Sequence, residues 1–178
     1  MVEGLTNYLM NTDDLERDDA VYNMAKAILE RDLSAALTAL RSWIASLPYD
    51  IITKKEWMRK KKREAFYKLI LYTAFSLLNS KVDTEVKSIL GRADVVIKTK
   101  TDIFVLELKV DDSVENALAQ IDSKGYAIPY SPLRLPQGGE TRVTKCGVSI
   151  SSEQRNITQW RITDAEGNVI EDKDYLNT

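Results

Sequence analysis

The segment 105–110, VLELKV, alternates between two kinds of side chain, and this alternation limits how the chain can fold. Successive side chains of a β-strand point to opposite faces, so Glu107 and Lys109 share one face and the intervening apolar residues share the other. Burying a carboxylate and an ammonium in so apolar a strand is costly unless the two are paired or hold a metal ion. The segment therefore predicts a central strand that carries a charged site on one face.

A second carboxylate, Asp94, stands at the start of the preceding predicted strand. The runs 93–100 and 103–110 are joined by a short turn and are typical of a β-hairpin. With the turn centred between residues 101 and 102, this pairing places Asp94 across from about Lys109 and diagonal to Glu107. Two carboxylates and a lysine are then expected at one edge of the sheet.

This trio suits the hydrolysis of a phosphodiester with a divalent cation. Asp94 and Glu107 are expected to be metal ligands, and Lys109 to orient the attacking water or to stabilise charge on phosphorus. The alternative is a ladder of salt bridges on one face of the sheet. The spacing of the three residues alone does not decide between the two interpretations.

The residue types that are missing narrow the chemistry further. Histidine is absent from the 178 residues, which excludes catalysis by Ser-His-Asp or Cys-His and zinc held by histidine. A metal must then be held by oxygen atoms, which favours Mg²⁺, Mn²⁺ or Ca²⁺. Cys146 is the single cysteine, so no intramolecular disulfide forms, and we expect a cytoplasmic protein. No apolar run approaches the ~20 residues that span a bilayer, so no membrane partner is expected.

The charge is unevenly distributed although the net charge is only −2. Residues 3–19 are acidic, whereas residues 54–63 carry seven basic side chains and one acidic one. A cluster this dense can neutralise several backbone phosphates, which predicts nucleic-acid contacts for Lys60, Lys61, Lys62 and Arg63. The alternative is a solvated helix face.

The first 80 residues are predicted to be helical. Residues 15–46 have apolar positions at helical spacing and form either one bent helix or two short ones, the second starting near Asp32. The next predicted helix is 53–79, with Thr53 as N-cap and Glu56 as its capping-box partner.

From residue 81 the pattern changes to strands. Strands are predicted at 81–88, 93–100, 103–110, 141–151 and 156–163, a helix at 112–128, and a frayed tail from Glu171. A strand-helix-strand crossover with helices on both faces gives an α/β fold around a small mixed central sheet. We expect residues 1–50 to be an N-terminal helical extension or connector and residues 51–178 to be one domain.

Three motifs resemble the PD-(D/E)XK nuclease superfamily: GRAD at 91–94, ELK at 107–109, and ALAQIDSKGY at 117–126. The similarity is greatest to the branch at the C-terminus of bacterial AAA-ATPase-like proteins, which reads GRxD, EFK and ALxQIxxKxY. The departures are Leu108 for the usual Phe and Ala93 for the leading proline. The run EAFYK at 64–68 also resembles that family's preceding helix.

The resemblance implies a restriction-endonuclease-like core and a role for each matching residue. Asp94 and Glu107 would bind metal, Lys109 would be the catalytic lysine, and Glu64 would bind metal or orient water. The remaining matches are in helix 112–128, where Gln120 and Tyr126 would line the site. Lys124 shares a helix face with Gln120 and would contact nucleic acid.

Several of these residues have alternatives. Glu64 could instead pair with Lys60 or Lys68 at helical spacing, and Glu85 is an alternative fourth acid. Arg92 either binds a backbone phosphate or pairs with Asp94. Tyr126 could be a half-buried packing residue. Trp57 and Trp160 are expected to be core or interface anchors.

The expected function is a Mg²⁺- or Mn²⁺-dependent nuclease domain acting on nucleic acid, with DNA as the expected substrate and backbone shape as the recognised feature. One alternative is a catalytically weak nucleic-acid-binding or regulatory module of an ATPase-associated protein. Another is a helical connector in which the sheet is only a scaffold. The resemblance also leaves room for an ATPase domain in a longer parent chain, and a homodimer is a further expectation.

Overall fold

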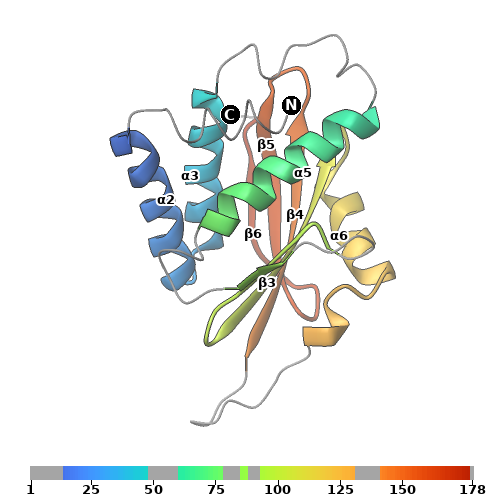
Figure 1. Ribbon diagram of the computed structural model, residues 1–178. Helices are drawn as coiled ribbons and strands as arrows, with labels where there is room; N and C mark the ends of the chain where they lie inside the picture. The colour runs from blue at the N-terminus through green and yellow to red at the C-terminus, as the bar shows by residue number, and fades with distance from the viewer. Residues whose placement is uncertain (1–13, 48–59, 78–84, 88–92, 131–140, 177–178) are drawn as a thin grey trace.

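The computed structural model describes residues 14–47, 60–77, 85–87, 93–130 and 141–176, without the side chains of 14–18, 60 and 85–87 (Figure 1). The elements in chain order are α2 (Asp14–Leu29), α3 (Leu33–Ser46), α5 (Lys60–Ser76), β1 (Glu85–Lys87), β2 (Val95–Lys98), β3 (Asp102–Val110), α6 (Val114–Ser123), the 3₁₀ turn η3 (Ile128–Tyr130), β4 (Arg142–Ser151), β5 (Asn156–Asp164) and β6 (Val169–Asp174).

The strands form one six-stranded sheet in the order β1-β2-β3-β4-β5-β6. β3 and β4 are parallel and are connected through α6, and the other neighbours are antiparallel. Parallel neighbours need a long crossover connection, and the segment between Val110 and Arg142 supplies it. The prediction of an α/β fold with a mixed central sheet flanked by helices is confirmed, and the N-terminal helices are present.

The hairpin β2–β3 forms as predicted, but its register differs by two residues. Val95 pairs with Leu106, and continuing this register places Asp94 beside Glu107 instead of Lys109. The predicted turn centre was wrong because Thr99 closes the turn earlier. Its backbone N–H donates to the carbonyl of Asp102 at 2.8 Å, and its hydroxyl accepts from the N–H of Asp102 at 2.9 Å.

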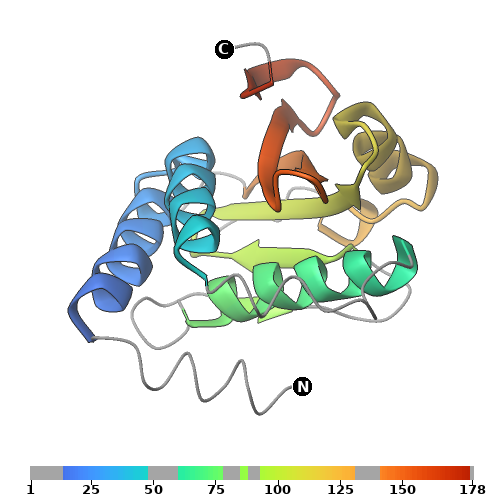
Figure 2. The ribbon, with the colours of Figure 1, turned by 90° about the horizontal axis from the view of Figure 1, so that it is seen from above.

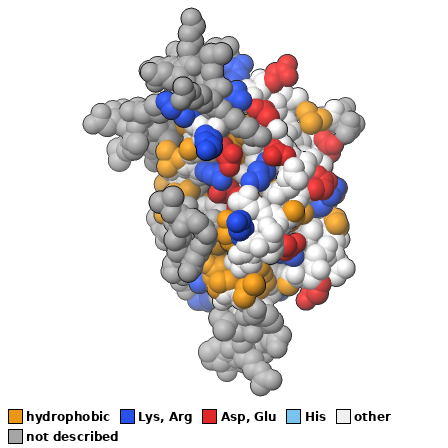
Figure 3. All heavy atoms as spheres, turned by 90° about the vertical axis from the view of Figure 1, so that its right-hand side faces the viewer, with side chains coloured by type: hydrophobic (Ala, Val, Ile, Leu, Met, Phe, Trp, Pro, Cys, Tyr) orange, Lys and Arg blue, Asp and Glu red, His pale blue; other side chains and the backbone are white. Residues whose placement is uncertain are grey.

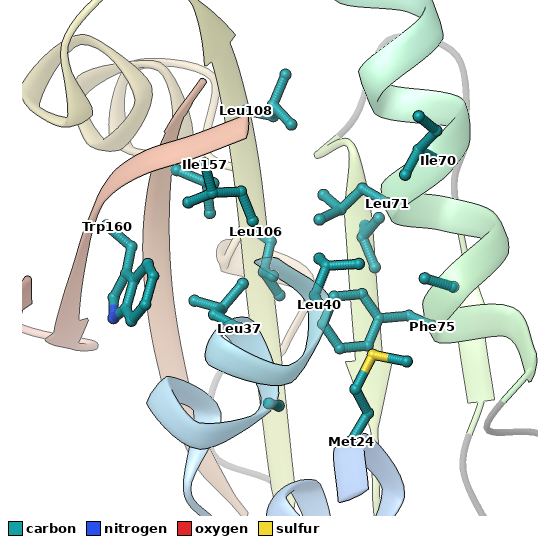
Figure 4. Packing of buried hydrophobic residues seen from close by; sticks show 14 of the residues in the cluster. Met24, Leu37, Leu40, Ile70, Leu71, Phe75, Leu106, Leu108, Ile157 and Trp160 are labelled. Atoms are coloured by element: carbon teal, nitrogen blue, oxygen red, sulfur yellow. The ribbon is translucent and has the colours of Figure 1, made fainter. Parts of the chain in front are cut away.

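The apolar face of the sheet packs against the helices α3 and α5, and α2 packs on α3 in the same core (Figure 2). Leu106 and Leu108 of β3 contribute to this core, together with Phe75 of α5 and Leu40 of α3 (Figure 4). These side chains are fully buried, and each removes enough apolar surface from water to contribute about 1.5–3 kcal/mol. The core therefore holds α5 against the strand residues Leu106 and Leu108.

The other face of β3 packs against α6. Val105 and Val96 lie in a second, smaller cluster with Ile121 of α6 and Tyr130. Glu107 is two residues from Val105, so its side chain belongs to this face. The alternation expected from the sequence thus separates the apolar core from the charged side chains.

The N-terminal helical stretch is two helices, one of the two predicted alternatives. Asp32 caps α3, since its Oδ1 accepts a hydrogen bond from the Ala35 N–H at 2.8 Å. Both helices share the large core with the sheet. The predicted start of the following helix at Thr53, its partner Glu56, and Trp57 all lie outside the described residues.

Two boundary predictions were wrong. α6 ends at Ser123 instead of continuing to residue 128, because Gly125 adopts a positive φ of 62° that terminates the helix. Ile128, the last residue of the predicted helix, lies in the 3₁₀ turn η3 and is 72% exposed.

The tail predicted to fray from Glu171 is part of strand β6, which pairs with β5. The pairing with β5 orders this segment although Val169 and Ile170 are exposed. Among the described helices, none is long and apolar enough to cross a membrane.

Candidate active site

Glu107 lies in the middle of β3 and is 0% exposed. Its Oε1 accepts a hydrogen bond from the Nε2 of Gln120 at 2.6 Å. Its Oε2 is buried and has no hydrogen-bond partner among the described residues. An unpartnered buried carboxylate oxygen is costly, so this atom indicates a binding position for a cation or another donor.

Lys109 lies two residues along the same face of β3. Its ammonium donates a short hydrogen bond to the Oε1 of Gln120 and lies 3.7 Å from the Oε1 of Glu107. The Nε2 of Gln120 is also 3.4 Å from the hydroxyl oxygen of Tyr126. One side-chain amide thus connects the lysine, the glutamate and the tyrosine.

Gln120 reaches these residues because α6 packs tightly on β4. Gly147 pairs directly with Glu107 in the sheet. A Cβ atom at Gly147 would lie only 2.5 Å from the carbonyl oxygen of Val114 and 3.1 Å from the Cγ of Leu118. The missing side chain at this position therefore allows α6 to lie close to the sheet.

Asp94 precedes β2 and is nearly buried, with 9% of its side chain exposed. Its Oδ2 accepts a hydrogen bond from the backbone N–H of Leu108 at 2.9 Å. This bond holds the Asp94 carboxylate against the backbone of β3 at Leu108, next to Glu107. The structure therefore brings Asp94, Glu107 and Lys109 together.

Glu64 approaches from α5 and is joined to the site by a lysine one helical turn later. The Nζ of Lys68 lies 2.8 Å from the Oε1 of Glu64, 2.8 Å from the Oδ1 of Asp94 and 3.9 Å from the Oε1 of Glu107. Glu64 thus pairs with Lys68, as the alternative interpretation had it, and the same lysine also contacts the two sheet carboxylates.

Burial controls the electrostatics of the site. Loss of hydration, followed by the nearby charge of Asp94, raises the pKa of Glu107 to about 7. Burial also raises the pKa of Asp94, although hydrogen bonds from Lys68 and from the Leu108 N–H oppose this. Burial acts to lower the pKa of Lys68, but its hydrogen bonds to Asp94 and Glu64 outweigh burial and raise it. The carboxylates therefore need compensating positive charge.

The residues present fit a hard divalent cation in their donor chemistry. Glu64, Asp94 and Glu107 offer carboxylate oxygens, the ligands that Mg²⁺ and Mn²⁺ prefer. The described residues nonetheless contain no group of three or more such side chains already arranged around an empty metal position. The Lys68 ammonium lies among the three carboxylates instead.

The basic residues lie apart from this cluster where their side chains are described. Lys61 and Lys62 are exposed on the first turns of α5, and Lys124 is exposed just after α6. Arg63 forms an ion pair with Asp111 at 3.2 Å.

The face shown in Figure 3 has no continuous basic patch among the described residues, because acidic and basic side chains are interleaved there. Arg92 and the side chains of Lys60 and Glu85 lie outside the described part.

Sequence reasoning missed two residues that shape the site. Lys68 was expected only as an alternative partner of Glu64 at helical spacing, and its contacts with Asp94 and Glu107 were not predicted. Gly147 carried a usable signal, since an isolated glycine within a strand often marks the close approach of another backbone.

One comparison with known proteins identifies a family for this chain. The family described as the PD-(D/E)XK nuclease superfamily matches residues 62–160, a span longer than half of the chain. The chain therefore belongs to the PD-(D/E)XK nuclease superfamily. Neither the comparison with curated proteins nor the comparison with solved structures gave a match.

Proposed function

We propose that the chain is a Mg²⁺- or Mn²⁺-dependent nuclease domain that hydrolyses phosphodiester bonds of DNA. The observation that carries the proposal is the buried Glu107, which lies between Gln120, Lys109 and Lys68 and has one carboxylate oxygen without a partner among the described residues. Membership of the nuclease superfamily supports the reaction class.

Asp94, Glu107 and Glu64 are the residues that would hold the cation. When bound, the cation supplies Lewis acidity and neutralises negative charge at the scissile phosphate. The backbone N–H of Leu108 orients Asp94 by the hydrogen bond described above, and Gln120 orients Glu107 in the same way. The chain thus fixes two carboxylates before any ligand arrives, which lowers the entropic cost of binding.

Lys109 is the residue proposed to act on the reacting atoms. Its ammonium orients the attacking water or stabilises the extra negative charge on the phosphoryl oxygens in the transition state. Gln120 accepts one of its hydrogen bonds, so the ammonium keeps its position but retains two further protons for donation. Tyr126 lines the site through its contact with Gln120.

The exposed Lys61, Lys62 and Lys124 are proposed to contact backbone phosphates, with Arg92, Lys60 and Arg63 as further candidates. Contacts of this kind position a nucleic acid without reading its sequence. The similarity of the motifs to the AAA-ATPase-associated branch supports a further proposal, that this domain acts beside an ATPase domain. A homodimer and a cytoplasmic location are also part of the proposal.

The test is a cleavage assay on plasmid and single-stranded DNA with Mg²⁺, Mn²⁺ or chelator. We expect cleavage by the wild type with metal, no cleavage in chelator, and restoration when metal is returned in excess. Asp94→Asn keeps the shape of the side chain but removes its charge, so this variant should be inactive with either ion. Equal cleavage by the wild type and Asp94→Asn would refute the proposal, as would undiminished cleavage in chelator.

A second test uses the close contact between β4 and α6. Gly147→Ala is expected to lower the free energy of unfolding by about 1–3 kcal/mol, because the added Cβ overlaps the carbonyl oxygen of Val114. The resulting shift of α6 moves Gln120 away from Glu107 and lowers the cleavage rate of the remaining folded protein. Denaturant unfolding and the cleavage assay measure the two effects.

Gly167→Ala is the matched control for this test. Gly167 has a positive φ of 97° and no atom within 4 Å of a new Cβ. The substitution should cost stability through backbone strain but leave the cleavage rate of the folded protein unchanged. If Gly147→Ala behaves in the same way as this control, α6 is not positioned by the missing side chain.

A further inference from the structure

Lys68 is surrounded by the three carboxylates that we propose as metal ligands. We infer that the ε-ammonium of Lys68 occupies the cation position in the metal-free protein and is displaced when a divalent ion binds. The inference rests on the proposed function and adds a residue that governs metal affinity. It follows from the positions of four side chains.

The distances show that the ammonium and a metal ion would use the same oxygens. Glu64 Oε1 and Asp94 Oδ1 are each 2.8 Å from the Lys68 nitrogen, so the two oxygens are separated by no more than twice that distance. The Oε1 of Glu107 faces the same nitrogen at 3.9 Å. Oxygens that converge on one cation in this way are available to another only after the first has left.

Lys68 is able to leave. Its side chain is 29% exposed and its four-carbon stem is flexible, so the ammonium has a path from the carboxylates to solvent. Lys109 is less exposed and less free to move. Its side chain is 15% exposed, lies on a central strand and is held by a hydrogen bond to Gln120. The two lysines therefore have different tasks.

The exchange also changes the charge that a phosphate would meet. With all three carboxylates ionised, Lys68 and Lys109 leave one negative charge uncompensated, which repels a phosphodiester. Replacing one ammonium by a divalent ion neutralises the cluster and frees Lys68 near it. The ammonium thus stabilises the metal-free fold and, by the same contacts, weakens metal binding.

The experiment compares Mn²⁺ affinity, measured by calorimetry, with thermal stability in chelator for the wild type and Lys68→Met. We expect Lys68→Met to bind Mn²⁺ about tenfold more tightly, because the ion no longer has to displace an ammonium from the carboxylates. A tenfold change in affinity corresponds to about 1.4 kcal/mol of binding free energy. We also expect a lower Tm in chelator and a larger rise of Tm on adding Mn²⁺. Lys68→Arg, which keeps the charge, should not bind more tightly than the wild type.

Lys26→Met is the matched control. Lys26 is also a helical lysine four residues from a glutamate, Glu30, but this ion pair at 3.9 Å is exposed on α2. Its removal should change neither the Mn²⁺ affinity nor the stability in chelator beyond the small effect of a surface pair. Any tightening seen in this control would show that the result with Lys68 reflects net charge alone.

Lys68→Gln is the second neutral variant if Lys68→Met does not fold. If neither folds in chelator, recovery of native circular dichroism on adding Mn²⁺ supports the inference, and failure to recover contradicts it. Wild-type affinity in a folded neutral variant, even with cleavage lost, overturns the inference but leaves the proposed function standing. Absence of Mn²⁺ binding by the wild type overturns both.

Discussion

Replacing Lys109 with alanine is expected to slow DNA cleavage by about 10²- to 10³-fold, which is typical for the loss of one preorganised donor to a developing charge. The ammonium is held by Gln120 and lies 3.7 Å from Glu107, so it is already oriented before substrate binds. Alanine removes the donor but keeps the strand, because the apolar face of β3 is unaffected. Single-turnover cleavage with saturating Mn²⁺ measures the loss.

Lys98→Ala is the control for this prediction. Lys98 also stands on a strand of the same sheet, and its ammonium lies 4.8 Å from the ring centre of Tyr130. This variant should cleave at the wild-type rate. A Lys109→Ala protein with the wild-type rate and an unchanged Tm would mean that the lysine has a structural role only.

Replacing Trp160 with alanine is expected to lower the free energy of unfolding by about 3–5 kcal/mol, the usual range for a buried aromatic residue. Trp160 is fully buried on β5 and is the largest such side chain among the described residues. Its Nε1 donates to the hydroxyl of Ser34 at 3.1 Å, and its ring centre lies 5.4 Å from that of Tyr175 (Figure 4 shows its place). The ring therefore connects α3, β5 and the segment after β6.

Denaturant unfolding followed by circular dichroism measures the effect, with Tyr22→Ala as control. Tyr22 is also aromatic but is exposed on α2, so its removal should change the free energy of unfolding by no more than about 0.5 kcal/mol. A loss below about 1 kcal/mol for Trp160→Ala would show that the N-terminal helices are not anchored to the sheet by this residue.

Local patterns predicted those parts of the fold in which one segment carries its own signal. The alternation of β3 identified both the core face and the charged face, since the period of two is fixed by strand geometry. The strand-helix-strand order predicted a crossover through α6, which the structure has between the parallel strands β3 and β4, and Asp32 marked the start of α3. Asp94, Glu107 and Lys109 were expected together and are found together.

Features that depend on a contact between distant segments were not predictable in the same way. The hairpin register was wrong because it depends on how the Thr99 side chain closes the turn. The strand β6 was missed because exposed residues such as Ile170 become ordered only through their pairing with β5. The position of Lys68 among three acids required the packing of α5 against the sheet, which periodicity does not specify.

The site is divided between one local unit and one distant helix, and this affects when it becomes complete. Lys109 and Glu107 are only 11 and 13 residues from their partner Gln120, so a single strand-helix unit assembles them. Glu64 reaches the sheet only when α5 docks on it. Contacts between distant segments carry a larger loop-closure cost than local ones. A chain in which α5 has not docked would therefore lack the full set of acids, and under the proposed function it would not cleave nucleic acid.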